Sequence, residues 1–556
     1  MRLQLAMQTA HGNLHLEIQT SRKSPVGILR TSFRENGKMK HTQHGRITGC
    51  SLEQLKLLQL AFRERVVPVD DPQAFKILNS REYGASDAIV AVAKQLDLHQ
   101  GLYSRPEPWV SSALAMIVGR LVYAGSKLSL CHHHPNTCLW ERCGIDEAPD
   151  VDVHCYEPMD RLLQRQGAIQ RNLARRHLTG GHLVLYDITS VYFEGEYKDS
   201  QLVTFGYNRD GKKAREQVVV GLICNGQGCP VGVEVYAGNT KEETTVVDKV
   251  QEIRANYGIE QVILVGDRGM ITRTNMEALK DEEDLQTIGA LTHGEMMSLR
   301  KEKVIDMELF DERSIHELTD PADPTRRYCL CRNPQSAQRE RATRQRLVDL
   351  TATALTEIAA YKRATTVAKL GARVGKALAK YKMGKFIQWS IDADQDKATS
   401  RKHRLIWSID AEKVAQEARF DGCYIISSDV GKEQMNTLEV VNAYKSLTFV
   451  ERAFRNLKTV QLEIRPVYHK HDERIRSHVF LCMLAYYLQW HMEQRLAPLF
   501  AHDGEGQARR WTFRGVIDCL AQITRNRVTV NGAEFCQNSI PTPEQDEILG
   551  LLQVSL

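Results

Sequence analysis

The stretch HLVLYDITSV, residues 182–191, constrains the fold most. It has the apolar content of a strand buried on both faces, yet it carries Asp187 at its centre. An isolated ionised carboxylate inside such a strand costs several kcal/mol, so proteins neutralise it, pair it with a cation or give it a metal ion. The fold must therefore bring a partner to Asp187 from elsewhere in the chain.

The hydrophobic pattern from residue 182 onward predicts strands in succession and then strands separated by a helix. The turn-rich link NGQGCP joins the second and third strands. The predicted elements are strands at 182–188, 217–224 and 231–238, a helix at 242–258, and strands at 261–267 and 285–291. This order predicts an α/β domain with a mixed five-stranded sheet flanked by helices.

A chain of 556 residues is too long for one hydrophobic core, and roughly three or four units are expected. Ahead of the sheet, Asn36-Gly37 predicts a basic β-hairpin, and Ser51 with Gln54 fits the capping box of a following helix. After the sheet, a charged helical stretch and the tryptophan-bearing strands KFIQWSI and HRLIWSI predict an insertion. The expected regions are 1–80 hairpin and helix, 81–180 helical, 181–294 first part of the sheet domain, 295–430 insertion, 431–500 second part, and 501–556 without an assigned role.

Composition describes an ordinary globular chain, with 42% hydrophobic and 26% charged residues and a net charge of +5 that by itself indicates no partner. The longest apolar run, at 479–490, is too short to span a bilayer, and the amino terminus lacks the apolar segment of a signal peptide. Thirteen scattered cysteines are typical of reduced thiols, so we expect a cytoplasmic protein with no membrane partner.

Two further carboxylates occupy positions that the same domain can bring near Asp187. Asp267 ends the fourth predicted strand, and Glu451 lies on a helix whose apolar stripe includes Val450 and Phe454. Hard oxygen ligands on rigid, adjacent elements suit a pair of Mg²⁺ ions, for which Mn²⁺ can substitute, and two such ions support phosphodiester displacement. Each carboxylate alone has a simpler explanation as a cap, a salt-bridge partner or a solvated charge.

Short motifs surround the three acids. The first strand carries DIT at 187–189, and the fourth strand ends in DRG at 267–269. The spacing Y-x2-R-x3-E-x6-K is filled by Tyr444, Leu447, Glu451 and Lys458, with leucine in place of arginine. Together with the stretches 205–240 and 420–429, these motifs resemble the DDE transposases of bacterial insertion sequences over about residues 182–490. The resemblance implies a ribonuclease H-like catalytic domain.

The resemblance also implies a reaction and its metal ligands. Such enzymes cut at transposon ends and then transfer the freed 3′-hydroxyls into target DNA. Asp187, Asp267 and Glu451 would hold the two metal ions. The implied partners are the terminal inverted repeats, the target DNA and a second copy of the chain, because pairing two ends requires a dimer. The N-terminal 180 residues would contribute to end binding, in the bacterial cytoplasm close to the nucleoid.

The signature further implies contacts to the cleaved DNA end by Tyr444 and Lys458. Leu447 cannot bind a phosphate, so the role of the missing arginine is in doubt. Arg268 and Arg455 are candidate substitutes, and whether the second strand is cut through a hairpin stays open.

The predicted insertion contains a strongly basic helix. Residues 361–385 include eight Lys or Arg and no acid. Steps of four, three and four positions place a set of cations on one helix face, namely Lys369, Arg373, Lys376 and Lys380. Like charges on one face repel one another and a polyanion relieves that repulsion, so we predict contact with DNA phosphates. The alternative is a solvated cationic face.

Three other features have both a functional and a structural interpretation. Basic residues at 465–478 either line a DNA channel or form a polar connector. Trp389 and Trp407 either stack on an unpaired base or belong to a core. The stretch LCHHHPNTC, at 130–138, lacks the paired spacings of structural zinc sites, so a polar helix end is the favoured interpretation.

Two rival functions stay open from the sequence. A ribonuclease H-like nuclease would cut without strand transfer, although Tyr444, Lys458 and the long insertion disfavour it. A catalytically silent, transposase-derived DNA-binding protein is disfavoured by the three intact acids, but Leu447 keeps it open. The sequence does not indicate the terminal repeats, the target site, or whether the element is active.

Overall fold

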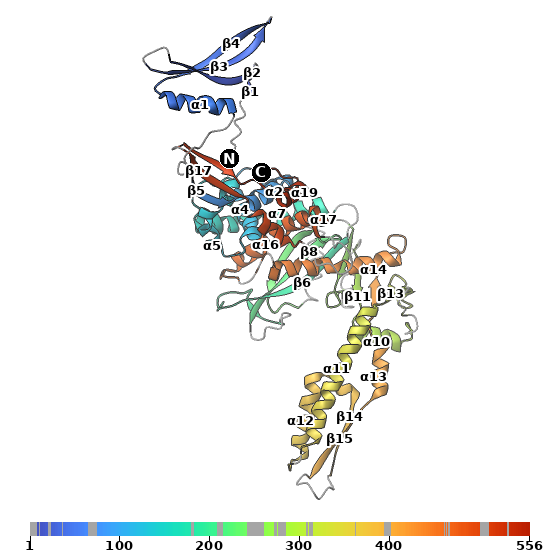
Figure 1. Ribbon diagram of the computed structural model, residues 1–556. Coiled ribbons are helices and arrows are strands. Elements are labelled where there is room, and N and C mark those ends of the chain that lie inside the picture. The colour runs from blue at the N-terminus through green and yellow to red at the C-terminus, as the bar shows by residue number, and fades with distance from the viewer. Residues whose placement is uncertain are drawn as a thin grey trace. The chain divides into compact units, whose positions relative to one another are not determined.

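The computed structural model separates the chain into two compact units. The first comprises Met1–Gly84, Pro135–Cys138 and Ala521–Thr542, and the second comprises Ala85–His134, Leu139–Leu520 and Pro543–Leu556 (Figure 1). The residues described are 8–9, 12–20, 24–35, 37–64, 75–178, 183–207, 215–241, 261–271, 275, 285–306, 310, 315–361, 363–393, 402–460, 462, 464, 467–500, 511–530 and 533–556.

The first unit contains the predicted hairpin in a four-stranded antiparallel sheet. Its strands, in spatial order, are β1 (Gln8–Thr9), β2 (Gly12–Gln19), β3 (Val26–Glu35) and β4 (Lys38–Ile47). Helix α1 (Leu52–Glu64) packs on β2, with Leu16, Ile28 and Leu55 buried between them. Ser51 and Gln54 exchange the two hydrogen bonds of the predicted capping box, at 2.8 and 3.2 Å. The predicted hairpin and helix are confirmed.

A second sheet in this unit joins segments from both ends of the chain. Strand β5 (Phe75–Glu82) pairs antiparallel with β17 (Thr524–Val530), which pairs antiparallel with β18 (Ala533–Asn538). Residues 501–556 had no assigned role in the sequence, because no local pattern indicates a strand partner so far away. Part of this C-terminal region therefore completes an N-terminal sheet.

The second unit contains the predicted helical region, packed around one buried helix. The helices of this layer are α2 (Gly84–Gln95), α3 (Leu98–Leu102), α4 (Pro108–Val122), α5 (Lys127–His132), α6 (Leu139–Arg142), η3 (Asp152–Tyr156), α7 (Glu157–His177), α16 (Asp472–Arg495), α17 (Ala497–Phe500), α18 (Phe513–Leu520) and α19 (Pro543–Leu552). The apolar run 479–490 is the buried middle of α16, which packs against α4 and α7. Within the described ranges, no helix is long and apolar enough to cross a membrane.

The large mixed sheet of the second unit has the five predicted strands at its centre. These are β6 (Leu183–Tyr192), β8 (Glu216–Asn225), β9 (Pro230–Ala237), β10 (Val262–Gly266) and β11 (Leu285–Ala290). Strands β9, β8 and β6 pair antiparallel, whereas β6, β10 and β11 pair parallel. The ribonuclease H-like fold class is thereby confirmed, and the helix predicted at 242–258 lies outside the described residues.

The sheet extends beyond the five predicted strands on both sides. Strand β16 (Cys423–Ser428) pairs antiparallel with β11, and β13 (Arg327–Arg332) and β12 (His316–Thr319) follow it. On the other side, β7 (Thr204–Phe205) pairs with β8. The range 295–430, predicted as an insertion, thus contributes three strands to the main sheet. Sequence analysis missed this because their strand partners are distant in the chain.

The rest of the range 295–430 forms a helical and hairpin subdomain. It comprises α10 (His293–Lys301), α11 (Pro334–Ala359), α12 (Val367–Tyr381), η5 (Gly384–Phe386), β14 (Ile387–Ala393), β15 (His403–Ile409) and α13 (Ala411–Ala418). Helix α11 follows β13 directly, and α13 leads back to β16 (Figure 1). A small apolar cluster holds α11, α12 and the hairpin together, and it contains Leu355, Leu370, Val374, Ile387 and Leu405. The two tryptophan-bearing strands were predicted correctly.

Candidate active site

Asp187 lies where the parallel pairing of the central sheet stops. Strand β10 pairs with β6 as far as Leu185, opposite Val265. Beyond Leu185, β8 is the one strand of the described residues that pairs with β6. The Asp187 side chain is half-buried, and its Oδ1 accepts a hydrogen bond of 2.8 Å from the N–H of Ile188. The aspartate that looked buried in a core strand therefore lies at the carboxyl edge of the parallel strands.

Asp267 is the first residue after β10 and begins a tight turn. Its carbonyl accepts the N–H groups of Met270 and Ile271 at 2.9 and 3.1 Å. The turn folds back onto the sheet because β10 and β11 present glycines to Ile271. A Cβ at Gly266 would lie 2.9 Å from Ile271, and one at Gly289 only 2.6 Å from it. This close packing fixes the position of the exposed Asp267 carboxylate beside the end of β6.

Glu451 lies on the outer side of a helix that packs on the sheet. Helices α14 (Thr437–Lys445) and α15 (Leu447–Arg455) are followed by the π-helical turn η6 (Asn456–Val460). Helix α15 packs against β6 and β8, and its buried side chains are those of Leu447, Val450, Ala453 and Phe454. Because Glu451 points away from this stripe, its carboxylate is exposed. The apolar stripe predicted from the sequence is the one that faces the core.

The three carboxylates line one pocket. The pocket has a volume of about 480 Å³ and is lined by Asp187, Asp267, Arg268, Asn333, Ser336, Glu340, Gly422, Cys423, Tyr424, Tyr444, Lys445, Leu447, Thr448 and Glu451. Strand β6, the end of β10 and helix α15 each supply one acid. The structure therefore brings together the three acids on which the sequence hypothesis depends.

The charged residues of this pocket shift the pKa of Tyr444. Burial raises the pKa of the Tyr444 hydroxyl, and the negative charges of Asp267 and Glu451 raise it further. The hydrogen bond and positive charge of Arg268 lower it in part. The tyrosine therefore stays protonated at neutral pH, close to two of the acids and to the one arginine among the residues that line the pocket.

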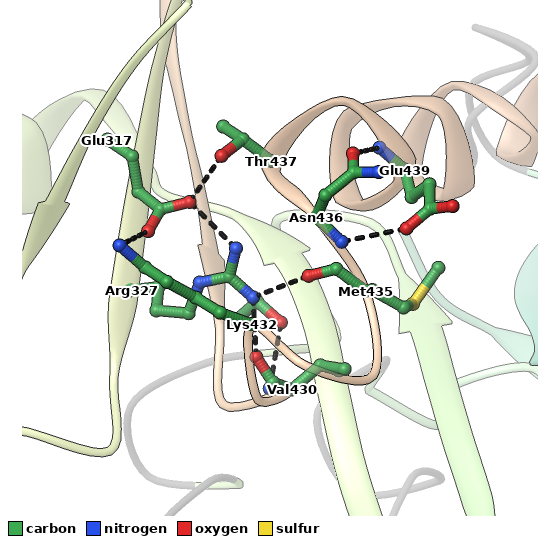
Figure 2. A network of polar contacts seen from close by, with 9 residues as sticks. Glu317, Arg327, Val430, Lys432, Met435, Asn436, Thr437 and Glu439 are labelled. Carbon is green, nitrogen blue, oxygen red and sulfur yellow. Dashed lines mark hydrogen bonds and ion pairs between the residues drawn. The ribbon is translucent and has the colours of Figure 1, made fainter.

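A buried ion-pair network fixes the start of the helix that carries Tyr444. Glu317 of β12 pairs with Arg327 and with Lys432, each at 2.7 Å, and accepts a hydrogen bond of 2.6 Å from the Thr437 hydroxyl (Figure 2). Burial alone would raise the pKa of the Glu317 carboxyl, but hydrogen bonds from Arg327, Lys432 and Thr437 lower it to about 2. Glu317 is therefore ionised, and it ties the edge of the sheet to α14.

Two further sets of hydrogen bonds complete this helix start. Arg327 donates to the carbonyls of Val430 and Met435, at 2.7 and 3.0 Å. Asn436 caps α14 in a reciprocal capping box with Glu439, with hydrogen bonds of 2.7 and 3.0 Å (Figure 2). The last turn of α14 then presents Tyr444 to the pocket.

The residues predicted to contact DNA fall into three groups. Tyr444 and Arg268 line the pocket of the three acids. Arg455 and Lys458 lie farther along, at the end of α15 and in η6, and are not among the residues that line it. The four cations of the basic helix lie on α12 and are all exposed, namely Lys369, Arg373, Lys376 and Lys380. Arg268, rather than Arg455, is the candidate arginine that the structure brings to Tyr444.

Sequence reasoning missed the part of the pocket that the extended sheet edge contributes. Asn333 caps α11, and Glu340 on the same helix accepts the N–H of Gly422 at 2.9 Å. Ser336 and Tyr424 come from the same two segments. The stretch 420–429, which resembles the family in sequence, did indicate this part of the pocket, because it contains Gly422, Cys423 and Tyr424. The pairing of β13 with β16, which assembles it, has no local signature.

The two tryptophans and the stretch 130–138 make contacts within the protein. Trp389 and Trp407 face each other across the hairpin, where Trp407 packs on the apolar cluster and Trp389 is 43% exposed. Cys131 lies 3.7 Å from the Cys155 sulfur, and His133 hydrogen-bonds the Ser129 carbonyl. In the ranges that the structure describes, the potential metal ligands that converge within 4.8 Å of one another lie elsewhere, at His177, Cys229 and His491.

Comparison with known proteins identifies the family. The family model described as "Transposase DDE domain" matches residues 180–488, which is more than half of the chain. The chain belongs to the DDE transposase family. It is accordingly a DNA transposase by family, and the match spans all three acids of the pocket.

Similarity to individual proteins is distant. The cryo-EM structure of the piggyBac transposase synaptic complex with hairpin DNA aligns with 8% identity and a TM-score of 0.34, over 79% of this chain and 76% of that one. The Mos1 transposase paired-end complex with left transposon end aligns with 10% identity and a TM-score of 0.14, over 42% of this chain and 67% of that one. No curated protein sequence matches the chain. The family assignment rests on the family model alone.

Proposed function

We propose that this transposase cleaves DNA at the ends of its own element with divalent metal ions and transfers the freed ends into target DNA. The observation that carries this proposal is the convergence of Asp187, Asp267 and Glu451 on one pocket from three different elements. Carboxylates gathered in this way repel one another unless a cation lies among them, and oxygen donors of this kind suit Mg²⁺ or Mn²⁺. The donor set therefore fits a pair of such ions.

Each acid has a distinct part in the proposal. The half-buried Asp187 is held by the sheet, Asp267 by its turn, and Glu451 by a helix packed on the same sheet, so all three are fixed before DNA arrives. Bound divalent ions supply an activated oxygen nucleophile and stabilise the leaving oxygen. The chain's own residues hold and orient these charges and align the scissile phosphate between them.

Cationic side chains around the pocket would hold the DNA. Arg268 can bind a phosphate at the cleaved end and hydrogen-bond Tyr444, which makes it the candidate to replace the arginine absent at Leu447. Arg455 ends α15 and Lys458 lies in the following turn, η6. Both would contact the DNA end at a greater distance from the cleavage site. The exposed cationic face of α12 would contact phosphates beyond the cleavage site. Recognition of terminal inverted repeats by a homodimer, in a bacterial cytoplasm, completes the proposal.

The test uses DNA that flanks the coding sequence, cut into labelled duplexes. With Mg²⁺ or Mn²⁺ we expect nicking at a defined position near an inverted repeat, and no nicking with a chelator present. Asp187→Asn should abolish nicking, with a loss of at least about a thousandfold, because removing one ligand of a metal pair disrupts charge stabilisation in the transition state. End binding measured without divalent ions should be unchanged.

Glu340→Gln provides the matched control, because it neutralises a carboxylate that lines the same pocket but bonds the Gly422 backbone. We expect this variant to keep nicking within about tenfold of the unaltered protein. Equal losses in both variants would contradict the assignment of the three acids. Specific binding of the end without any cleavage would favour instead a catalytically silent, transposase-derived DNA-binding protein. Leu447, at the position of the signature arginine, is the feature that supports this alternative.

A further inference from the structure

Two imidazoles and one thiol converge at a place away from the pocket of the three acids. They belong to His177 at the end of α7, to Cys229 just before β9, and to His491 on α16. The potential ligand atoms of these side chains lie within 4.8 Å of one another. In a tetrahedral zinc site the ligand atoms lie about 3.3 to 3.6 Å apart, so side-chain shifts of about 1 Å close this group around an ion.

The turn that carries Cys229 is held by one asparagine side chain. Oδ1 of Asn225 accepts hydrogen bonds from the N–H groups of Gln227 and Cys229, at 3.0 and 2.9 Å. The N–H of Asn225 donates to the Cys229 carbonyl at 3.0 Å. Its side-chain amide donates to the His177 carbonyl at 3.2 Å. Asn225 therefore positions the residue that carries the thiol and ties it to the end of α7.

The two imidazoles lie next to each other, with ring centroids 5.3 Å apart. The Tyr487 hydroxyl lies 2.9 Å from Nε2 of His177 and orients that ring. Nε2 of His491 is buried and has no hydrogen-bond partner among the described residues. Burial lowers the pKa of His177 to about 4 and that of His491 to about 3, and the positive charge of Arg176 contributes to both. Both rings are therefore neutral at pH 7, and each offers a lone pair.

We propose that His177, Cys229 and His491 bind one Zn²⁺ ion, with a water molecule in the fourth position. Imidazole nitrogens and a thiolate sulfur are ligands that zinc prefers, whereas Mg²⁺ prefers oxygen. Both histidines are only half-buried, so water can reach the ion. None of the three residues is among those that line the pocket of the three acids. The zinc site therefore differs from the proposed metal pair in its ligands and in its place.

Binding of the ion replaces the proton of the thiol. Burial raises the pKa of Cys229, and the positive charge of Arg176 lowers it in part, so the metal-free side chain is a thiol. The ion displaces that proton to solvent and forms a bond to the thiolate. The thiolate cancels one of the two positive charges of the ion, which limits its repulsion by Arg176. The guanidinium of Arg176 also donates a hydrogen bond to the Leu96 carbonyl.

The ion would fasten two helices to the sheet. Helices α7 and α16 pack against each other and against β9, and each of these three elements carries or adjoins one ligand (Figure 1). The turn before Cys229 also touches the helix of Glu451. A Cβ at Gly228 would lie 2.6 Å from Phe449 of α15. The zinc ion is therefore structural, and it supports the packing behind α15 without contact with the reacting atoms.

The experiment measures the metal content of the full chain, produced with a histidine-free affinity tag. After incubation with Zn²⁺ and removal of unbound metal, mass spectrometry of the elements should find one tightly held zinc ion per chain. Cys229→Ser should lower this content at least about tenfold, because a neutral hydroxyl replaces the thiolate. Cys329→Ser is the matched control, because Cys329 is likewise buried but lies on β13. It should keep the full content. No retained zinc in the unaltered protein, or equal zinc in Cys229→Ser, would overturn the proposal.

Cobalt absorption tests the ligands in the unaltered protein, so that the result does not depend on how a variant folds. One equivalent of Co²⁺ should give the near-ultraviolet charge-transfer band of a cobalt–thiolate bond and the visible bands of a tetrahedral ion, and Zn²⁺ should displace both. Bound Co²⁺ without the thiolate band would contradict the role of Cys229. Asp187→Asn should keep the band and the zinc, so failure of the proposed active site and failure of this site are separable results.

Thermal unfolding tests the structural role. An ion that binds only the folded chain raises the melting temperature, so removal of zinc by a strong chelator should lower that of the unaltered protein by a few degrees. Added Zn²⁺ should restore it. The melting temperature of Cys229→Ser should not respond to the chelator. An unaltered protein whose melting temperature is the same with and without zinc would overturn the structural role.

Discussion

The ion-pair network at the start of α14 depends on one carboxylate, that of Glu317. Glu317→Gln keeps the shape and size of the side chain but removes its charge, and so leaves Arg327 and Lys432 without their shared partner. Arg327 is only 4% exposed, so water cannot replace the carboxylate. The variant should therefore loosen α14, the helix that brings Tyr444 to the candidate active site.

The magnitude follows from the pKa. The Glu317 carboxyl has its pKa lowered from the usual 4.5 to about 2. That difference corresponds to about 3 kcal/mol of folding free energy. Because the pKa is lowered in the folded protein, this stability is fully present above about pH 5 and is lost as the pH falls toward 2. Linkage gives a loss of about 1 kcal/mol at pH 4 and about 2 kcal/mol at pH 3.

Hydrogen exchange of α14, followed by mass spectrometry, measures this opening locally in the full chain. At pH 7 the protected amides of the variant should exchange about 100-fold faster than those of the unaltered protein. At pH 4 this ratio of exchange rates should be about fourfold smaller, because the ionised Glu317 carboxylate of the unaltered protein then contributes less folding free energy. Comparing the two proteins at each pH cancels the intrinsic pH dependence of exchange.

Glu196→Gln is the control, because Glu196 and its partner Lys198 are 79% and 80% exposed and such pairs contribute little. Its exchange should match that of the unaltered protein. If the α14 amides of Glu317→Gln exchange at pH 7 within twofold of the rate in the unaltered protein, the account of this network is refuted. A ratio of the two exchange rates that grows as the pH falls would refute it as well.

Three further predictions concern DNA binding, the packing of the central sheet and the stability of α12. Replacing the four cations of α12 by Gln should lower the salt slope of DNA binding by up to about 3.6, at 0.9 per phosphate, and anisotropy titrations that return an unchanged slope would contradict phosphate contact. Gly289→Val should destabilise the protein by about 1 to 3 kcal/mol in urea unfolding, because its Cβ meets Ile271 at 2.6 Å. Gly375→Ala on α12 has no neighbour within 4 Å and should instead stabilise that helix by about 0.5 to 1 kcal/mol.

The central strands and the α15 stripe could be predicted because their signals are local. Strands β6, β8 and β10 are continuous apolar runs that end in turn residues, and such runs form buried strands wherever they pair. The stripe of α15 follows helical spacing, so the outward position of Glu451 was predictable. Asp187 and Asp267 were predictable as ligands only through the strand order that brings the ends of β6 and β10 together.

The remaining architecture depends on contacts between distant residues. Ser80 of β5 donates a hydrogen bond to Asn526 of β17, 446 positions later, and no local periodicity encodes that pairing. The wall of the active-site pocket formed by Glu340 and Gly422 depends in the same way on β13 meeting β16.

Counting bound Mn²⁺ by electron paramagnetic resonance tests most directly whether the three carboxylates form one divalent-metal site. In the presence of end DNA that has already been cleaved at the transposon end, the unaltered protein should hold two ions per chain, and Glu340→Gln should hold the same number. Asp187→Asn combined with Glu451→Gln should hold none at the same free concentration. Two ions retained by the double variant would contradict the account, because the metal would then lie away from these acids.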